Sequence, residues 1–179
     1  AVTTESRGMV FGRRSTIDRE RQIVPSPPLE NDMYGELIPQ VVAVLIGYLE
    51  SAGGVASLFG PPDPTPREIN DVVEDISRGF NVEQATRGSP RLAGASLAAY
   101  IRFLPEPLVT SPHYEKLCAA VDTEIYADRI ALVRDEVAEM PDSNQAVLHR
   151  LFHFLSKLSE RGEHNPREEL AAYWATMLT

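Results

Sequence analysis

Apolar residues recur at spacings of three and four along most of the chain, and this spacing predicts helices. Seven stretches show the pattern, and most are bounded by proline, glycine, serine or aspartate, which favour helix ends. No window of four to eight residues alternates apolar and polar side chains convincingly, so we predict no sheet and an all-α fold. The predicted helices cover residues 34–52, 67–78, 92–103, 111–121, 128–140, 144–161 and 166 onward.

The first 32 residues lack this periodicity. They are polar, mixed in charge and interrupted by Pro25, Pro27 and Pro28. We therefore predict an extended arm over residues 1–32 and a helical domain over residues 33–179. The chain begins without an initiator methionine and stops within a helical pattern. We expect a segment of a longer protein, truncated at the C-terminal end of the domain and accompanied by other domains of the same chain.

The charge balance narrows the class of partner. Lys and Arg number 17 and Asp and Glu number 26 among 179 residues, which gives a net charge of −9. Proteins that bind nucleic acids or anionic lipid surfaces need a basic face, so this balance argues against both. The longest apolar run, Val41 to Leu49, is nine residues, about half of a membrane span. One cysteine, Cys118, cannot form an internal disulfide, so we expect a soluble, cytoplasmic domain without direct membrane insertion.

Two histidines suggest a metal-binding site. His149 and His153 are four residues apart, a spacing that suits a metal on one helix face, but Arg150 stands where an H-E-x-x-H motif has glutamate. Both histidines are predicted to face solvent, opposite a stripe that includes Leu151, Phe152 and Leu155.

Other candidate chemistry is sparse. The acidic residues are scattered over predicted helix surfaces, as on any solvated face. Cys118 shares an apolar helix face with Leu117 and Val121, which predicts a buried and inert thiol. The chain contains no G-x-S-x-G, P-loop or G-x-G-x-x-G motif. We therefore expect no enzymatic activity of its own, no metal and no cofactor.

Five landmarks follow one another at separations that are more specific than any single motif. They are Ile38-Pro39 through Tyr48-Leu49-Glu50, then Ser57-Leu58-Phe59, then Tyr100 to Leu108 with its L-P-E-P-L turn, then Asn144, and finally residues 170–178. In this order they resemble the RhoGAP domain family, and the resemblance covers about residues 9–179. It implies an all-α bundle of about seven to nine helices. It also implies a regulator in signal transduction, because RhoGAP domains accelerate GTP hydrolysis by Rho-type small GTPases.

The resemblance places an arginine finger directly after the loop phenylalanine. In this chain Phe59 is followed by Gly60. A finger contributes about 10³–10⁵ in rate because its guanidinium stabilises charge on the transferring phosphoryl group. Glycine offers no such group, and Pro61 and Pro62 stiffen the loop that follows. The resemblance thus implies a GTPase-binding domain whose activating power is weak or lost.

Other polar positions of the family pattern have also changed. Its lysine falls on Ala98 and the asparagine of its last helix falls on Glu169, whereas its helix-end arginine is kept as Arg102. Arg102 and Asn144 are the remaining candidate contacts with a GTP-bound Rho- or Rac-type GTPase. Arg102 has an alternative structural role, since a basic residue near a helix C-terminus is favoured by the helix dipole.

Two further hypotheses stay open. One is an active GTPase-activating domain whose finger lies elsewhere, with Arg67 as the nearest downstream candidate. The other is a structural helical module that mediates dimerisation or docking without contacting a GTPase. The acidic balance favours the second of these, because a surface that meets a nucleotide needs basic groups.

Overall fold

The computed structural model describes residues 29–31, 37–52, 64–160 and 167–178, and in this part of the chain it has eight helices, as an all-α fold requires. The helices are α2 (Gln40–Ser51), α3 (Pro66–Ser77), α4 (Val82–Ala85), α5 (Pro90–Arg102), α6 (Ser111–Val121), α7 (Tyr126–Ala138), α8 (Asp142–Glu160) and α9 (Arg167–Leu178). The predicted all-α class is therefore confirmed. Residues 1–28 of the predicted arm lie outside the described residues.

One small sheet accompanies the helices. β1 (Leu29–Asn31) pairs antiparallel with β2 (Leu37–Pro39), and Leu29 lies opposite Pro39. The prediction of no sheet is wrong in this detail, because each strand has three residues and no periodicity test resolves so short a segment. β2 leads directly into α2, which therefore begins at Gln40 and not at residue 34.

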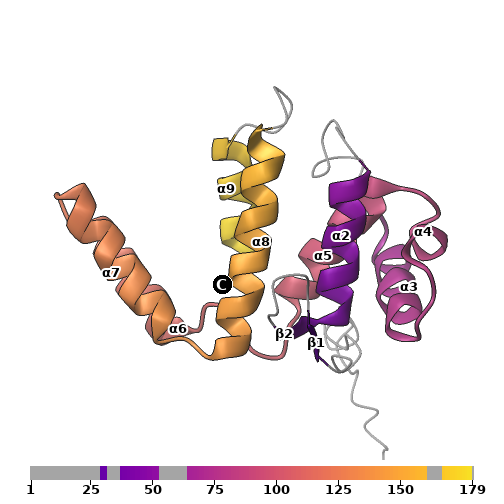
Figure 1. Cartoon of the computed structure of the whole chain (residues 1–179), viewed down its shortest axis with the longest axis horizontal. Coiled ribbons are helices and arrows are strands. Elements are labelled where there is room, and N and C mark those ends of the chain that lie inside the picture. The colour runs from indigo at the N-terminus through magenta and orange to yellow at the C-terminus, as the bar shows by residue number, and fades with distance from the viewer. Residues whose placement is uncertain (1–28, 32–36, 53–63, 161–166, 179) are drawn as a thin grey trace, which may run out of the picture.

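The hydrophobic core lies between α2, α3, α5, α8 and α9 (Figure 1). α2 packs extensively against α5, and α5 also packs against α3 and α9. Because α2 and α5 are apolar on more than one face, they occupy the interior, whereas α3 buries a single stripe. The largest fully buried side chains are Trp174, Tyr100 and Phe154.

Local sequence signals fix several helix starts. Thr65 accepts a hydrogen bond from the Glu68 backbone N–H, and the Glu68 side chain accepts one from the Thr65 backbone N–H. This reciprocal capping box, followed by Pro66 at the first helical position, ends the preceding loop and starts α3. Ser89 caps α5 in a similar way by accepting from the Leu92 N–H.

The two ends of the bundle are defined by contacts far apart in the sequence. At one end, the Asn144 side chain donates to the Leu108 carbonyl at 2.9 Å, and the Val109 N–H donates to the Leu178 carbonyl at 3.1 Å. This end thus gathers the start of α8, the finish of α9 and the L-P-E-P-L turn after α5. The other end holds the finish of α8 and the start of α9.

The α6–α7 hairpin projects away from this bundle (Figure 1). α7 contains no buried residue, and the two helices pack mainly on each other. Cys118 is exposed on α6, so its predicted burial is wrong. Phe152 of α8 is also exposed, although the sequence placed it in the buried stripe. No helix in the described part of the chain has the length and apolar character needed to cross a membrane.

Candidate functional site

The loop predicted to carry a catalytic arginine lies outside the described residues. Phe59 and Gly60 belong to residues 53–63, which the structure does not describe. The described chain on either side is the end of α2, closed by Ala52, and Pro64, just before α3. The candidate site is therefore described from the end of α2 and the start of α3, which flank this segment in the chain, and from the predicted site residues that the structure describes.

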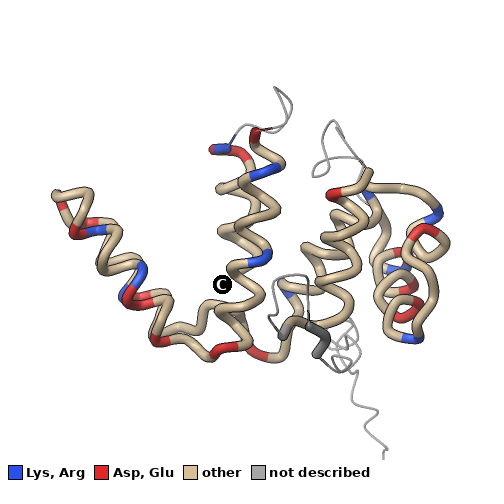
Figure 2. Tube along the Cα trace, in the orientation of Figure 1, with Lys and Arg blue, Asp and Glu red and all other residues tan. Residues whose placement is uncertain are grey.

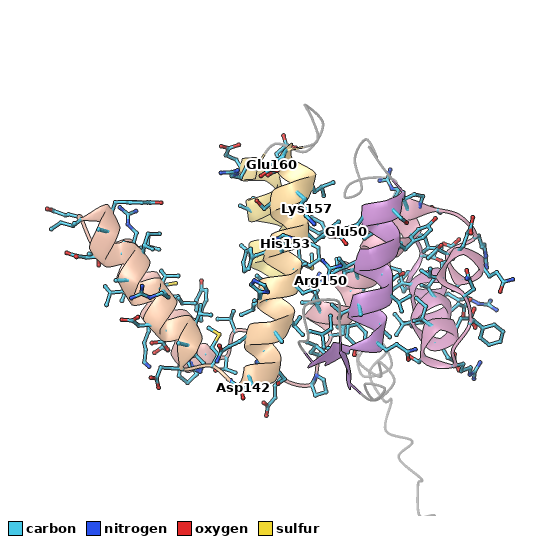
Figure 3. All side chains as sticks on the ribbon, in the orientation of Figure 1. Glu50, Asp142, Arg150, His153, Lys157 and Glu160 are labelled. Carbon is cyan, nitrogen blue, oxygen red and sulfur yellow. The ribbon has the colours of Figure 1, made fainter. Side chains whose placement is uncertain are left out.

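A buried ion pair holds the end of α2 against α8. Arg150 is 4% exposed, and its two terminal nitrogens donate to the two carboxylate oxygens of Glu50 at 3.0 Å and 2.8 Å. Lys157, two turns further along α8, lies 3.7 Å from the same carboxylate. We call Glu50, Arg150 and Lys157 the α2–α8 clamp; Figure 3 shows them facing one another across the two helices. Bidentate pairing of this kind fixes distance and orientation together.

The clamp favours the charged form of its carboxyl group. The bidentate hydrogen bonds from Arg150 lower the pKa of Glu50, and this effect outweighs partial burial, which acts in the opposite direction. The positive charges of Arg150 and Lys157 lower the pKa further. Glu50 is therefore ionised at neutral pH. Its ion pair with Arg150 holds the last turn of α2 against the middle of α8.

Sequence reasoning did not identify Arg150 as part of a site. It noted this arginine only as a departure from a metal-binding motif. The available signal was its position: Arg150 lies three residues after Val147 and four before Phe154, so it falls on the buried face of α8. An arginine on a buried face requires a partner, and the glutamate at the end of α2 supplies one.

Arg102, the retained arginine of the predicted site, ends α5 and is exposed. Its guanidinium lies 5.8 Å from the centre of the Phe103 ring, a cation–π distance. Ala98, one turn earlier, is buried in the core. Its methyl group therefore makes no polar contact with a partner. Arg102 is thus positioned for an external contact, whereas Ala98 serves packing.

Asn144 is committed to an internal contact. Its amide donates to the Leu108 carbonyl, and its half-buried side chain thereby ties the start of α8 to the L-P-E-P-L turn. This bond satisfies a backbone acceptor that the turn leaves without a helical partner. The predicted role of Asn144 as a partner contact stays a prediction; the observed geometry makes it a positioning residue.

The remaining predicted positions lie towards the other end of the bundle. Glu169 is exposed in the first turn of α9, where a carboxylate is favoured by the helix dipole. Arg67 is exposed in the first turn of α3, four positions after residue 63. Figure 2 shows acidic and basic positions together at the ends of α2, α8 and α9 on this side.

The structure therefore divides the predicted site into two groups. Arg102 and Asn144 lie at the end that contains the L-P-E-P-L turn, whereas Glu169 lies at the far end of α8 and α9. α8 has 19 residues, so at 1.5 Å per residue it separates the two ends by about 28 Å.

Metal-binding and histidine chemistry can be checked in the part of the chain that the structure describes. The described residues hold no group of three or more His, Cys, Asp or Glu side chains placed to bind a metal ion. His149 and His153 stack on each other with ring centres 6.5 Å apart; His149 is exposed, as predicted, and His153 is half-buried. The pairing of Glu50 with Arg150 and Lys157 holds the end of α2 against α8.

Comparisons with known proteins agree on the fold and the family. A family model described as RhoGAP domain matches residues 39–178. The Rho GTPase-activating protein gacJJ of Dictyostelium discoideum is 29% identical over 143 residues, which cover 77% of this chain and 16% of that protein. Rho GTPase-activating protein 1 of Mus musculus is 22% identical over 166 residues, which cover 86% of this chain and 38% of the relative. The chain thus spans well under half of the length of these relatives.

A solved structure gives the same result for the fold. The crystal structure of human Rho GTPase activating protein 15 superimposes with a TM-score of 0.70 at 19% sequence identity. The match covers 79% of this chain and 69% of the other. At this level of sequence identity the similarity shows that the two proteins share the helical fold.

Proposed function

This chain belongs to the RhoGAP domain family, and from this membership we propose that it binds a Rho- or Rac-type small GTPase in its GTP-bound form and activates it weakly or not at all. The observation that carries the second half of the proposal is Gly60, at the position where the resemblance places the arginine finger. The domain would act in the cytoplasm as a regulator, within a longer chain that contributes other domains.

A glycine at the finger position lacks the guanidinium group that an arginine finger supplies. GTP hydrolysis develops negative charge on the oxygens of the transferring phosphoryl group, and an inserted guanidinium stabilises that charge. Its contribution of about 10³–10⁵ in rate corresponds to roughly 4–7 kcal/mol of transition-state stabilisation. Binding of the GTPase does not depend on this group alone, so loss of the finger is compatible with retained binding.

Three other positions of the family pattern support the same interpretation. Ala98 is buried and apolar where the family pattern has lysine. Glu169 is an exposed carboxylate where the pattern has asparagine, and its negative charge would oppose a nucleotide phosphate. Arg102 remains exposed and able to meet an acidic surface of a partner.

The α2–α8 clamp supports a role for the end of α2 in contact with a partner. Because Glu50 is fixed to Arg150, the end of α2 from which residues 53–63 depart is held against α8. We assign the clamp a positioning role in GTPase binding.

The test of the proposal is a nucleotide-dependent binding measurement. Rho, Rac and related GTPases, each loaded either with a non-hydrolysable GTP analogue or with GDP, are titrated with the domain in a calorimeter. We expect binding to at least one GTPase that is at least tenfold tighter in the GTP-analogue form. Arg102→Glu should weaken it, whereas Arg78→Glu, an exposed change at the end of α3, serves as the matched charge control. Absence of nucleotide-dependent binding would support a structural module instead.

One specific observation keeps a second candidate function in view. Arg67 is exposed in the first turn of α3, four positions after residue 63, and this exposure supports an active domain with a displaced finger as the alternative. If the domain accelerates hydrolysis and Arg67→Ala abolishes the acceleration while binding is retained, this alternative is correct.

A further inference from the structure

The exposed apolar surface of the described chain is concentrated on the α6–α7 hairpin. Of nine large hydrophobic side chains that are exposed, six lie between Tyr114 and Leu132. Their exposed fractions run from 48% to 71%. Isolated apolar side chains on a surface are ordinary, but a concentration of this kind marks an interaction surface.

The hairpin is an antiparallel helix pair with little support from the bundle. His113, near the start of α6, lies 2.6 Å from Glu136, near the end of α7, and Lys116 lies 3.0 Å from the same carboxylate. Leu117 and Val137 make partial contact with the core, while α7 has no buried residue. The polar contacts thus fix how the two helices face each other, and among the described residues several outer apolar side chains of the pair are exposed.

Helix geometry brings the apolar residues of α6 and α7 to one side. At 100° per residue, Tyr114, Cys118 and Val121 form one stripe on α6, and Tyr126, Ile130 and Val133 form one stripe on α7. When the two helices run antiparallel and meet through His113 and Glu136, both stripes point to the same side of the pair. We call these six residues the hairpin face: Tyr114, Val121, Tyr126 and Ile130 are among the exposed large apolar side chains, Cys118 is exposed, and Val133 is half-buried. Leu132 lies on the opposite side of α7 and provides a matched control.

The charge of the hairpin restricts what can cover this face. Residues 111–139 contain seven acidic and three basic side chains, a net charge of −4. Two exposed acidic residues, Glu115 and Asp122, border the stripe on α6. A second copy of the chain would bring like charges together, and an anionic membrane would be repelled as well. An occupant with basic groups beside an apolar stripe would match both the negative charge and the apolar side chains of this surface.

We propose that the hairpin face binds a basic amphipathic helix of a partner protein. The partner helix lies along the hairpin face, completes a three-helix arrangement, and directs Lys or Arg side chains towards Glu115 and Asp122. This is the helix-in-groove mode, in which apolar anchors recur at three and four spacing. The interaction goes beyond GTPase binding and does not depend on it, because none of its residues belongs to the α2–α8 clamp or to the 53–63 segment.

A labelled synthetic peptide tests the proposal. α6 and α7 have 11 and 13 residues, so an occupant of matching length has about 12 residues at 1.5 Å each. The probe carries leucine at i, i+3, i+4 and i+7 positions and lysine elsewhere, and a peptide of equal composition in scrambled order is the control. Fluorescence anisotropy gives the affinity for the full 179-residue chain, and circular dichroism checks that each variant is folded.

The variants separate apolar docking from simple charge attraction. Ile130→Glu removes an anchor of the hairpin face, and Leu132→Glu adds the same charge to the opposite side of α7. We expect Ile130→Glu to weaken binding at least tenfold, Leu132→Glu to change it less than twofold, and Glu115→Lys to weaken it several-fold. Equal effects of the two glutamate variants, or equal affinity for the scrambled peptide, would overturn the proposal. So would a dimer of the free chain in sedimentation that Ile130→Glu dissociates, because the face would then be covered by a second copy.

Discussion

The ion pair between Glu50 and Arg150 in the α2–α8 clamp predicts that replacing one partner lowers the free energy of unfolding more than replacing both would suggest by addition. In the variant Glu50→Leu the 4%-exposed guanidinium of Arg150 loses the carboxylate that it contacts at 2.8 Å and 3.0 Å. Breaking a buried pair from one side costs about 3–5 kcal/mol. Glu50 retains 18% exposure, so we place the cost near the lower limit, at about 3 kcal/mol.

The reverse variant and the double variant complete the cycle. Arg150→Met leaves Glu50 with the more exposed Lys157 at 3.7 Å, and we expect a loss of about 2 kcal/mol. The double variant replaces both charges by apolar side chains of similar size, and such replacements are often nearly neutral. We expect it to be no less stable than Arg150→Met, which gives a coupling energy of at least about 3 kcal/mol.

The assay is urea unfolding followed by far-UV circular dichroism at pH 7, with the free energy of unfolding obtained by linear extrapolation. Additive single effects, with coupling below about 0.5 kcal/mol, would refute the idea that the two side chains act as a unit. A pH series gives an independent check. Because the pKa of Glu50 is lowered in the folded state, its stabilisation is present above the unfolded pKa near 4.3 and is lost as the pH falls through the lower folded value. Between about pH 5 and pH 3 the parent chain should therefore lose more stability than Arg150→Met does.

Three further predictions concern single residues. Asn144→Ala removes the bond to the Leu108 carbonyl and should lower the free energy of urea unfolding by about 1–2 kcal/mol; no change would exclude its positioning role. Thr65→Ala removes the cap of α3 and should cost about 1 kcal/mol in the same assay, whereas Thr65→Ser should restore most of it. Gly60→Arg should raise single-turnover hydrolysis less than about tenfold, because Ala98 remains apolar and the loop prolines remain; a rescue of about 10³ would show that the rest of the site is intact.

Most of the helical framework could be predicted from the sequence. The stripe of residues 111–121 predicts α6 with the observed limits, and the predicted helices at 67–78 and 92–103 differ from α3 and α5 by one or two residues at each end. These segments combine a clear apolar period with proline, serine or glycine at their ends, so local signals agree with tertiary packing. α4, with four residues, is too short to show a helical period.

The errors arise where burial depends on distant parts of the chain. Cys118 and Phe152 lie on apolar helix faces, and the period alone does not tell whether another element covers such a face. Arg150 shows the opposite case, because a charged residue is buried when a carboxylate 100 positions earlier in the chain reaches it. The resemblance to the family supplied the order of the landmarks, but it did not indicate that Arg102 and Glu169 lie towards opposite ends of the bundle.

The central claim is that this RhoGAP-family domain binds its GTPase without supplying an effective finger. Single-turnover hydrolysis of GTP by the Rho-type GTPase that binds the domain tests it most directly, at a domain concentration that saturates the complex. We predict that the rate rises by less than about tenfold over the intrinsic rate, far below the 10³–10⁵ of an arginine finger. Acceleration of about 10³ or more by the unmodified domain would contradict the account, because a guanidinium would then reach the phosphoryl group from another position.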